Sequence, residues 1–171
     1  MKIMKKLLLA VLSFLIAAPV FAQNEVNGFS EEITINGESY LVSDALACLD
    51  YRLIAKRDCF KSMIGKFPAY GVIDGSNKVI VPCECSGVMF EPKKGCILIL
   101  HSNKQLLKSK FGIVDFNGKE IIPVSIDMKT SFSNPDKKVW KHYDDLPADV
   151  KEQMMEVYNQ KKALFDAKMG R

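Results

Sequence analysis

The chain has 171 residues, with 24 Lys or Arg against 20 Asp or Glu, for a formal net charge of +4. Three of the basic residues, Lys2, Lys5 and Lys6, belong to the first 22 residues, so the rest of the chain carries 21 basic and 20 acidic residues, or +1. A balance this even argues against a nucleic-acid partner, which needs a concentrated basic surface. The cluster Lys137-Lys138-Lys141 is either a small basic patch or a solvated loop face.

Residues 1–22 have the pattern of a secretory signal peptide. The basic start is followed by the apolar run Leu7–Ala18, which is short for a membrane span, and Val20-Phe21-Ala22 places small residues before Gln23. We therefore predict export through a cleavable signal peptide, with a periplasmic or extracellular location. Residues 23–171 are expected to form a single β-rich domain. No later apolar stretch in the sequence is long enough to predict a membrane span in the mature chain.

The first elements of the mature chain predict a hairpin. Two apolar runs, Ile33–Ile35 and Tyr40–Val42, flank Asn36-Gly37, which fits the primed turns of two-residue hairpins. Next, Ser43 or Asp44 is placed to cap a short helix through Ala45, Leu46, Leu49 and Leu53. We expect that helix to be followed by a strand over Arg52–Lys56, and a strand without the helix is the alternative. Residues 58–69 form a connection.

Thirteen residues then occur twice at an offset of 41: YGVIDGSNKVIVP at Tyr70–Pro82 and FGIVDFNGKEIIP at Phe111–Pro123. Such a fixed offset is the signature of a repeat architecture. Each copy predicts a β-hairpin whose Asp accepts backbone hydrogen bonds and whose Asn77 or Gly118 takes a positive φ. The closing prolines, which lack an N–H, are expected at a strand end or on a sheet edge. The residues that define the repeat are Tyr70, Gly71, Asp74, Pro82, Phe111, Gly112, Asp115, Gly118 and Pro123.

This pattern of aromatic, Gly, two apolar residues, Asp, a turn with Gly-Lys, two apolar residues and Pro resembles the WG-containing repeat family of bacteria. In that family the hairpin is followed by a Phe, an acidic-Gly turn and another apolar strand. The matching residues over about Leu53–Asp127 are Phe90, Gly95 and the strand Cys96–Leu100, with Lys94 in the usual acidic position. Tyr70 and Phe111 replace the hallmark Trp. The resemblance implies an interaction module.

The C-terminal part predicts one helix. Met128–Lys138 has an irregular composition, and Asp144, Asp145 and Pro147 then indicate the start of a helix over about 146–169. An apolar stripe at helical spacing is expected to pack on the sheet, with an external partner helix as the alternative: Val150, Met154, Val157, Leu164 and Phe165. The expected fold class is therefore mainly β (α+β), with antiparallel β-hairpin repeats and a packed C-terminal helix.

Five cysteines are the most chemical feature of the sequence. In an oxidising compartment we expect pairing, with Cys48–Cys59 closing a short loop. If the chain folds back near Phe90, Cys85 falls opposite Cys96, and Cys83 competes for the same partner. Cys83, Cys85, Cys96 and His101 are also of soft-metal ligand types, but they lack paired C-x-x-C spacing, so neither a metal nor a cofactor is predicted.

The sequence contains no G-x-S-x-G, H-E-x-x-H or phosphate-loop motif, and Asp74 and Asp115 are explained as turn residues. We therefore expect a non-catalytic binding module that holds a protein through the repeat face. The alternatives are a neutralising partner of an exported toxin or enzyme, and an envelope protein that binds a small ligand or metal. Phe90, Phe116 and Trp140 are the candidate contact residues if exposed; burial in the core is the competing interpretation.

Overall fold

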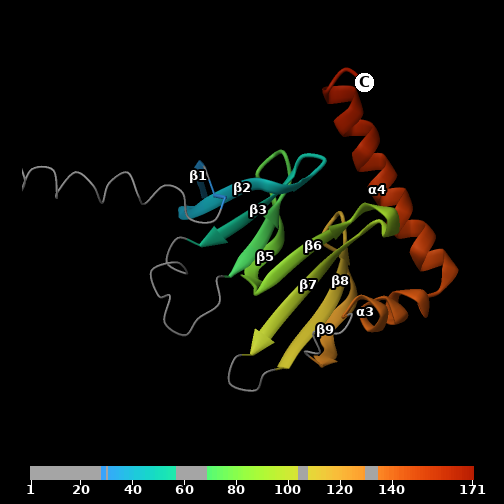
Figure 1. Ribbon diagram of the computed structural model, residues 1–171. Helices are drawn as coiled ribbons and strands as arrows, with labels where there is room; N and C mark the ends of the chain where they lie inside the picture. The colour runs from blue at the N-terminus through green and yellow to red at the C-terminus, as the bar shows by residue number, and fades with distance from the viewer. Residues whose placement is uncertain (1–27, 30, 57–68, 104–107, 130–134) are drawn as a thin grey trace, which may run out of the picture.

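The computed structural model describes residues 28–29, 31–56, 69–103, 108–129 and 135–171, and these form two antiparallel sheets followed by two helices (Figure 1). The predicted signal peptide lies outside the described residues. Strands account for 52% of the residues that the structure describes. The prediction of a mainly β fold with a C-terminal helix is confirmed.

Sheet A contains five strands in the order β1-β2-β3-β4-β5. They are β1 (Glu31–Ile35), β2 (Glu38–Cys48), β3 (Tyr51–Lys56), β4 (Tyr70–Ile73) and β5 (Val79–Cys85). The predicted hairpin at Asn36-Gly37 joins β1 to β2, and both turn residues have positive φ, 52° and 83°. This is the geometry that a type I′ turn requires.

Sheet B contains four strands in the order β6-β7-β8-β9. They are β6 (Gly87–Glu91), β7 (Cys96–Asn103), β8 (Lys108–Asp115) and β9 (Glu120–Lys129), with the short 3₁₀ helix η1 (Pro92–Lys94) between β6 and β7. Strands β5 and β9 are the last strands of their sheets and carry Pro82 and Pro123. The expected edge position of both prolines is confirmed, since neither has an N–H to give to a further strand.

The two sequence repeats form the same bulged hairpin. In the first, Tyr70 pairs with Cys85 and Val72 with Val81. In the second, the residues 41 positions later pair in the same way, Phe111 with Ile126 and Ile113 with Ile122. In both hairpins the glycine between the two pairs, Gly71 or Gly112, lies opposite three residues of the partner strand. The first of these three residues is the proline, Pro82 or Pro123. The Gly is required because a Cβ at Gly71 would lie 2.6 Å from the Val81 carbonyl oxygen, and one at Gly112 would lie 2.7 Å from that of Ile122.

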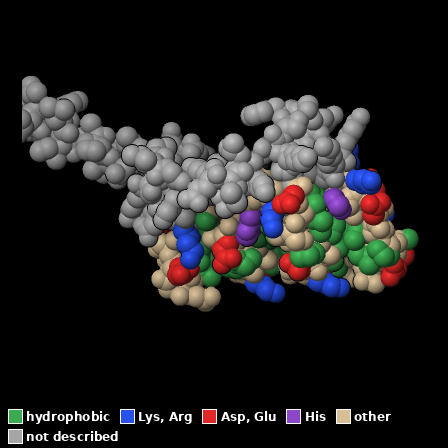
Figure 2. Space-filling view, turned by 90° about the horizontal axis from the view of Figure 1, so that it is seen from below, with side chains coloured by type: hydrophobic (Ala, Val, Ile, Leu, Met, Phe, Trp, Pro, Cys, Tyr) green, Lys and Arg blue, Asp and Glu red, His purple; other side chains and the backbone are tan. Residues whose placement is uncertain are grey.

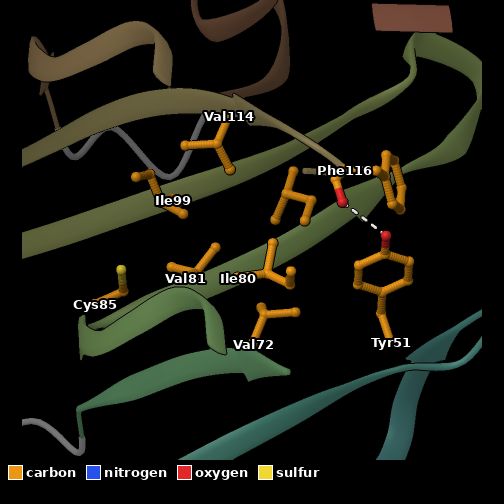
Figure 3. Packing of buried hydrophobic residues seen from close by; sticks show 9 residues of the cluster. Tyr51, Val72, Ile80, Val81, Cys85, Ile99, Val114 and Phe116 are labelled. Carbon is orange, nitrogen blue, oxygen red and sulfur yellow. Dashed lines mark hydrogen bonds between the residues drawn. The ribbon is translucent and has the colours of Figure 1, made fainter. Parts of the chain in front are cut away.

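The hairpin of the first repeat, β4–β5, and that of the second repeat, β8–β9, face the same direction in the stack of the two sheets. Val72 and Val81 of sheet A meet Ile99 and Val114 of sheet B in the central core (Figure 3). The residues that correspond to Val72 and Val81 in sheet B lie instead on its opposite face. The units are therefore stacked like successive members of a solenoid, in which each unit buries one face against its neighbour.

Helices α3 (Pro135–Asp144) and α4 (Ala148–Lys168) cover that opposite face of sheet B (Figure 1). Tyr143 of α3 and Met154 of α4, 8% and 1% exposed, pack there with Phe111 and Ile113. The two helices occupy the place of a next repeat and act as a terminal cap. The predicted helix at about 146–169 is confirmed as α4.

Two local predictions are wrong. The expected short helix through Ala45–Leu53 is the hairpin β2–β3, in which Leu49 takes a φ of 58° in a two-residue turn and Cys48 pairs with Tyr51. Pairing with β3 and burial of Val42 override the local helical pattern. The expected irregular stretch Met128–Lys138 instead contains the end of β9 and the start of α3, where Pro135 takes the first helical position that suits its fixed φ.

Candidate functional site

The two repeat turns have the same hydrogen-bond network. Asp74 Oδ1 accepts from the backbone N–H groups of Ser76 and Lys78 at 2.9 and 3.0 Å. Asp115 Oδ1 accepts from those of Asn117 and Lys119 at 2.8 and 2.9 Å. Positive φ values fall on Asn77 and Gly118, 63° and 82°, as the sequence predicted. Both carboxylates therefore serve as turn acceptors.

The titration of Asp74 reflects this network. Burial alone would raise the pKa of its carboxyl group, but the hydrogen bonds from Ser76 and Lys78 and the charge of Lys161 outweigh it. The net result is a pKa below the ordinary value for Asp.

A groove lies between the second repeat turn and α4. It has a volume of about 450 Å³ and is lined on the turn side by Asp115, Asn117, Lys119 and Ile121. On the helix side it is lined by Gln153, Met154, Glu156, Val157 and Gln160. Its buried lining residues are Met154 and Asp115, and its exposed lining residues carry amide, carboxylate and ammonium groups. This combination suits a side chain of another protein that makes both apolar and polar contacts.

This groove has no local signature in the sequence. Gln153, Glu156 and Gln160 are exposed residues of the polar side of a predicted helix, and nothing local marks them as a lining. Lys119 and Ile121 belong to the repeat, so half of the site lies on the predicted repeat face. Only the packing of α4 through Met154 brings the two halves together.

The predicted contact aromatics are not a surface cluster. Phe116 is fully buried, with its ring 5.2 Å from Tyr51 and 5.0 Å from Tyr158, so its assignment as an exposed contact residue is wrong. Phe90 and Trp140 are partly buried, and they pack against the central core and the helix-covered face of sheet B, respectively. Phe116 is a core residue, as the competing interpretation has it, because its turn is covered by sheet A and α4.

Tyr70 and Phe111, the first residues of the two repeats, both have packing roles. Phe111 is 2% exposed beneath the helices, and Tyr70 stacks on Phe29 with ring centroids 6.2 Å apart.

The predicted Cys85–Cys96 disulfide is not formed. Both thiols are free and buried, Cys85 in the central core and Cys96 on the helix-covered face. The chain folds back at Pro92–Gly95 instead of at Phe90, so Cys96 pairs with Glu91. Cys59 lies outside the described residues, and Cys48 carries a free thiol.

The candidate soft-metal ligands are also kept apart. Cys83, Cys85 and Cys96 belong to three different core clusters, and His101 is exposed on β7. Within the described ranges, no group of three or more His, Cys, Asp or Glu side chains is arranged to hold a metal ion. Burial, reinforced by nearby carboxylates, raises the pKa of Cys85 to about 11 and that of Cys96 to about 12. Both thiols are therefore protonated at neutral pH and unsuited to nucleophilic chemistry.

Lys94 holds the helical cap to sheet B. Its Nζ lies 4.4 Å from the Tyr143 ring centroid and 5.1 Å from that of Trp140, and Tyr143 donates a hydrogen bond of 3.3 Å to the Lys94 carbonyl oxygen. A Cβ on the next residue, Gly95, would lie 2.7 Å from the Met154 carbonyl oxygen. This close approach fixes α4, and with it the helix wall of the groove.

Comparison with known protein families, curated proteins and solved structures finds no match. In the part of the chain that the structure describes, no helix is both long and apolar enough to cross a membrane.

Proposed function

We propose that this chain is an exported, non-catalytic module that binds another protein in the groove between the second repeat turn and α4. The observation that carries the proposal is the composition of that groove: the apolar side chains of Ile121, Met154 and Val157 lie beside the buried Asp115 carboxylate and a set of exposed polar residues. The resemblance to WG-containing repeats, which implies an interaction module, supports the same function.

The surface charge supports a protein partner. The face seen in Figure 2 shows acidic and basic side chains interspersed, with apolar side chains between them. The groove itself is lined by two acidic side chains, the buried Asp115 and the exposed Glu156, and by one basic side chain, the exposed Lys119. Such a mixed surface favours a partner with charges of both signs over a polyanion.

The test is a pull-down with the protein expressed from the full sequence and tagged at its C-terminus, from the envelope and secreted fractions of its own cells. We expect a stoichiometric protein partner that is lost with Lys119→Glu, at the groove rim. Lys110→Glu makes the same charge change at an exposed position of β8 away from the groove, and it should leave binding unchanged. Equal capture by both variants, or no protein partner, would overturn the proposal.

A further inference from the structure

We infer that the partner protein places an arginine side chain in the groove between the second repeat turn and α4, with its guanidinium group on the Asp115 carboxylate. The inference rests on the proposed function, because it names the chemistry that the same groove recognises. It starts from Asp115, which is only 4% exposed and yet lines the groove. Burying a carboxylate to this extent is costly unless its oxygens find hydrogen-bond or charge partners.

The fold uses only one of the two carboxylate oxygens of Asp115. Oδ1 accepts from the backbone N–H groups of Asn117 and Lys119 at 2.8 and 2.9 Å. Among the residues that the structure describes, none makes a hydrogen bond or an ion pair with Oδ2. Because no buried side-chain oxygen or nitrogen of those residues lacks a hydrogen-bond partner, Oδ2 must be open to solvent, and the hollow that Asp115 lines is this groove. The turn therefore presents a free acceptor of a largely buried acid to the groove.

The first repeat shows that the turn does not require this arrangement. Asp74 Oδ1 accepts the two equivalent backbone N–H groups and also the Ser76 hydroxyl, at 2.7 Å. At the position of Ser76 the second repeat has Asn117, which donates through its backbone N–H. Asp74 is also more exposed than Asp115 and does not line the groove. Burial of the acid beside a groove is thus particular to the second repeat.

The apolar part of the lining suits the methylene stem of an arginine. Ile121, Met154 and Val157 line the groove beside Asp115, and a long basic side chain packs its stem on such surface while its charged end reaches a polar group. Met154 and Val157 belong to the predicted apolar stripe of α4 and pack on the body, whereas Leu164 of the same stripe is 69% exposed. The stripe prediction therefore holds only in part.

The polar part of the lining suits the guanidinium group. Glu156 supplies a second carboxylate, and Gln160 donates to its Oε1 through Nε2 at 3.3 Å, which leaves the Gln160 amide oxygen as an acceptor. A guanidinium group has several N–H donors in a planar fork and is more weakly hydrated than an ammonium group. Arginine is therefore better suited than lysine to a partly desolvated carboxylate that is flanked by further acceptors.

The charge of the groove also favours a cation. Two acidic side chains, Asp115 and Glu156, line it against one basic side chain, Lys119. Lys119 is exposed and is placed to meet an acidic residue of the same partner. For an isolated arginine derivative, however, Lys119 is only a repelling charge. Lys119→Glu should therefore release the protein partner and yet tighten the binding of the isolated derivative.

The test uses N-acetyl-arginine amide as the probe, titrated into the protein expressed from the full sequence and followed by two-dimensional amide NMR at about 150 mM NaCl. We expect a Kd on the order of 1–10 mM, as befits one side chain in one groove, with shifts at Asn117, Lys119 and the groove residues of α4. N-acetyl-citrulline amide has the same shape without the charge and should bind at least about 5-fold more weakly. N-acetyl-lysine amide should bind at least about 2-fold more weakly.

Two pairs of variants locate the site. Asp115→Asn keeps an oxygen for the turn but removes the charge, and it should weaken the arginine derivative at least about 5-fold. Asp74→Asn makes the same change in the equivalent turn away from the groove and should stay within about 2-fold of the parent. Because Asp115→Asn also touches the fold, Glu156→Lys at an exposed lining position is a second variant, with an expected loss of at least about 3-fold. Glu152→Lys is its control, since Glu152 is exposed on α4 but does not line this groove. Circular dichroism checks that each variant is folded.

Equal binding of the arginine and citrulline derivatives would overturn the inference, and so would tighter binding of the lysine derivative. A folded Asp115→Asn variant that binds the arginine derivative like the parent would do the same. If the pull-down captures a protein that Lys119→Glu releases but that Asp115→Asn and Glu156→Lys both retain, the arginine is rejected while the proposed function stands. If no protein is captured, both fail, whether or not the arginine derivative binds.

Discussion

The Tyr51 hydroxyl donates a buried hydrogen bond of 2.6 Å to the backbone carbonyl oxygen of Phe116, and the two rings meet edge to face at 5.2 Å (Figure 3). This contact joins β3 of sheet A to the turn of the second repeat. The first repeat has Gly75 at the position of Phe116, and there a Cβ would overlap the Asp50 carboxylate. The turn of the second repeat is therefore covered by sheet A, whereas the turn of the first repeat lies at the surface.

Tyr51→Phe should destabilise the fold by about 1–3 kcal/mol, because it leaves the Phe116 carbonyl oxygen buried without its partner. Urea unfolding followed by circular dichroism measures the loss. Ser125→Ala, which removes an exposed hydroxyl that donates at 3.3 Å to the Pro123 carbonyl oxygen, is the control and should change stability by less than about 0.5 kcal/mol. Equal effects of the two substitutions would contradict the role given to Tyr51.

The glycines of the bulged hairpins should be irreplaceable in both copies. Gly71→Ala and Gly112→Ala each place a Cβ within 2.7 Å of a backbone carbonyl oxygen, which cannot move aside as a flexible side chain could. We expect a loss of about 2–3 kcal/mol or more for each. Gly87→Ala is the matched control, since its Cβ would meet only Leu100 side-chain atoms, at 3.7 Å or more, and it should cost less than about 1 kcal/mol. Tolerance of Ala at Gly71 or Gly112 would mean that the strands can separate at the bulge.

The sequence predicted the parts of the fold that depend on local chemistry. The Asp acceptors, the positive φ at Asn77 and Gly118 and the edge prolines are properties of a few consecutive residues, and all are present. The β2–β3 hairpin was missed because Leu49 has no turn-forming side chain and takes its positive φ only through strand pairing. The groove could not be predicted, since Lys119 and Gln153 meet only after α4 docks.

Acid should weaken the first repeat turn through Asp74. Because its folded pKa lies below the unfolded value of about 3.9, ionised Asp74 contributes stability at neutral pH that is lost as pH falls below that value. Asp74→Asn keeps the acceptor oxygen without the charge. It should therefore flatten the fall in unfolding free energy between about pH 5 and pH 2, as measured by urea unfolding at each pH. An unchanged slope would show that Asp74 titrates alike in both states.

The buried thiols should resist modification in the folded protein. With a pKa of about 11, Cys85 is ionised to the extent of only about one part in a thousand at pH 8, and Cys96 even less. Cys48 is partly exposed and should react with iodoacetamide before either of them, although burial raises its pKa as well. Peptide mass mapping over time gives the order of labelling. Labelling of Cys96 ahead of Cys48, or a Cys85–Cys96 disulfide in the native protein, would contradict the structure.

Because α4 caps sheet B, truncating a buried side chain of this helix should reduce stability much more than truncating an exposed one. Met154→Ala removes a side chain that is 1% exposed beneath the cap, and it should cost about 2–5 kcal/mol through the cavity that it leaves. Leu164→Ala should change stability by less than about 0.5 kcal/mol, because that side chain is 69% exposed. A small cost at Met154 would mean that sheet B is stable without its helical cap.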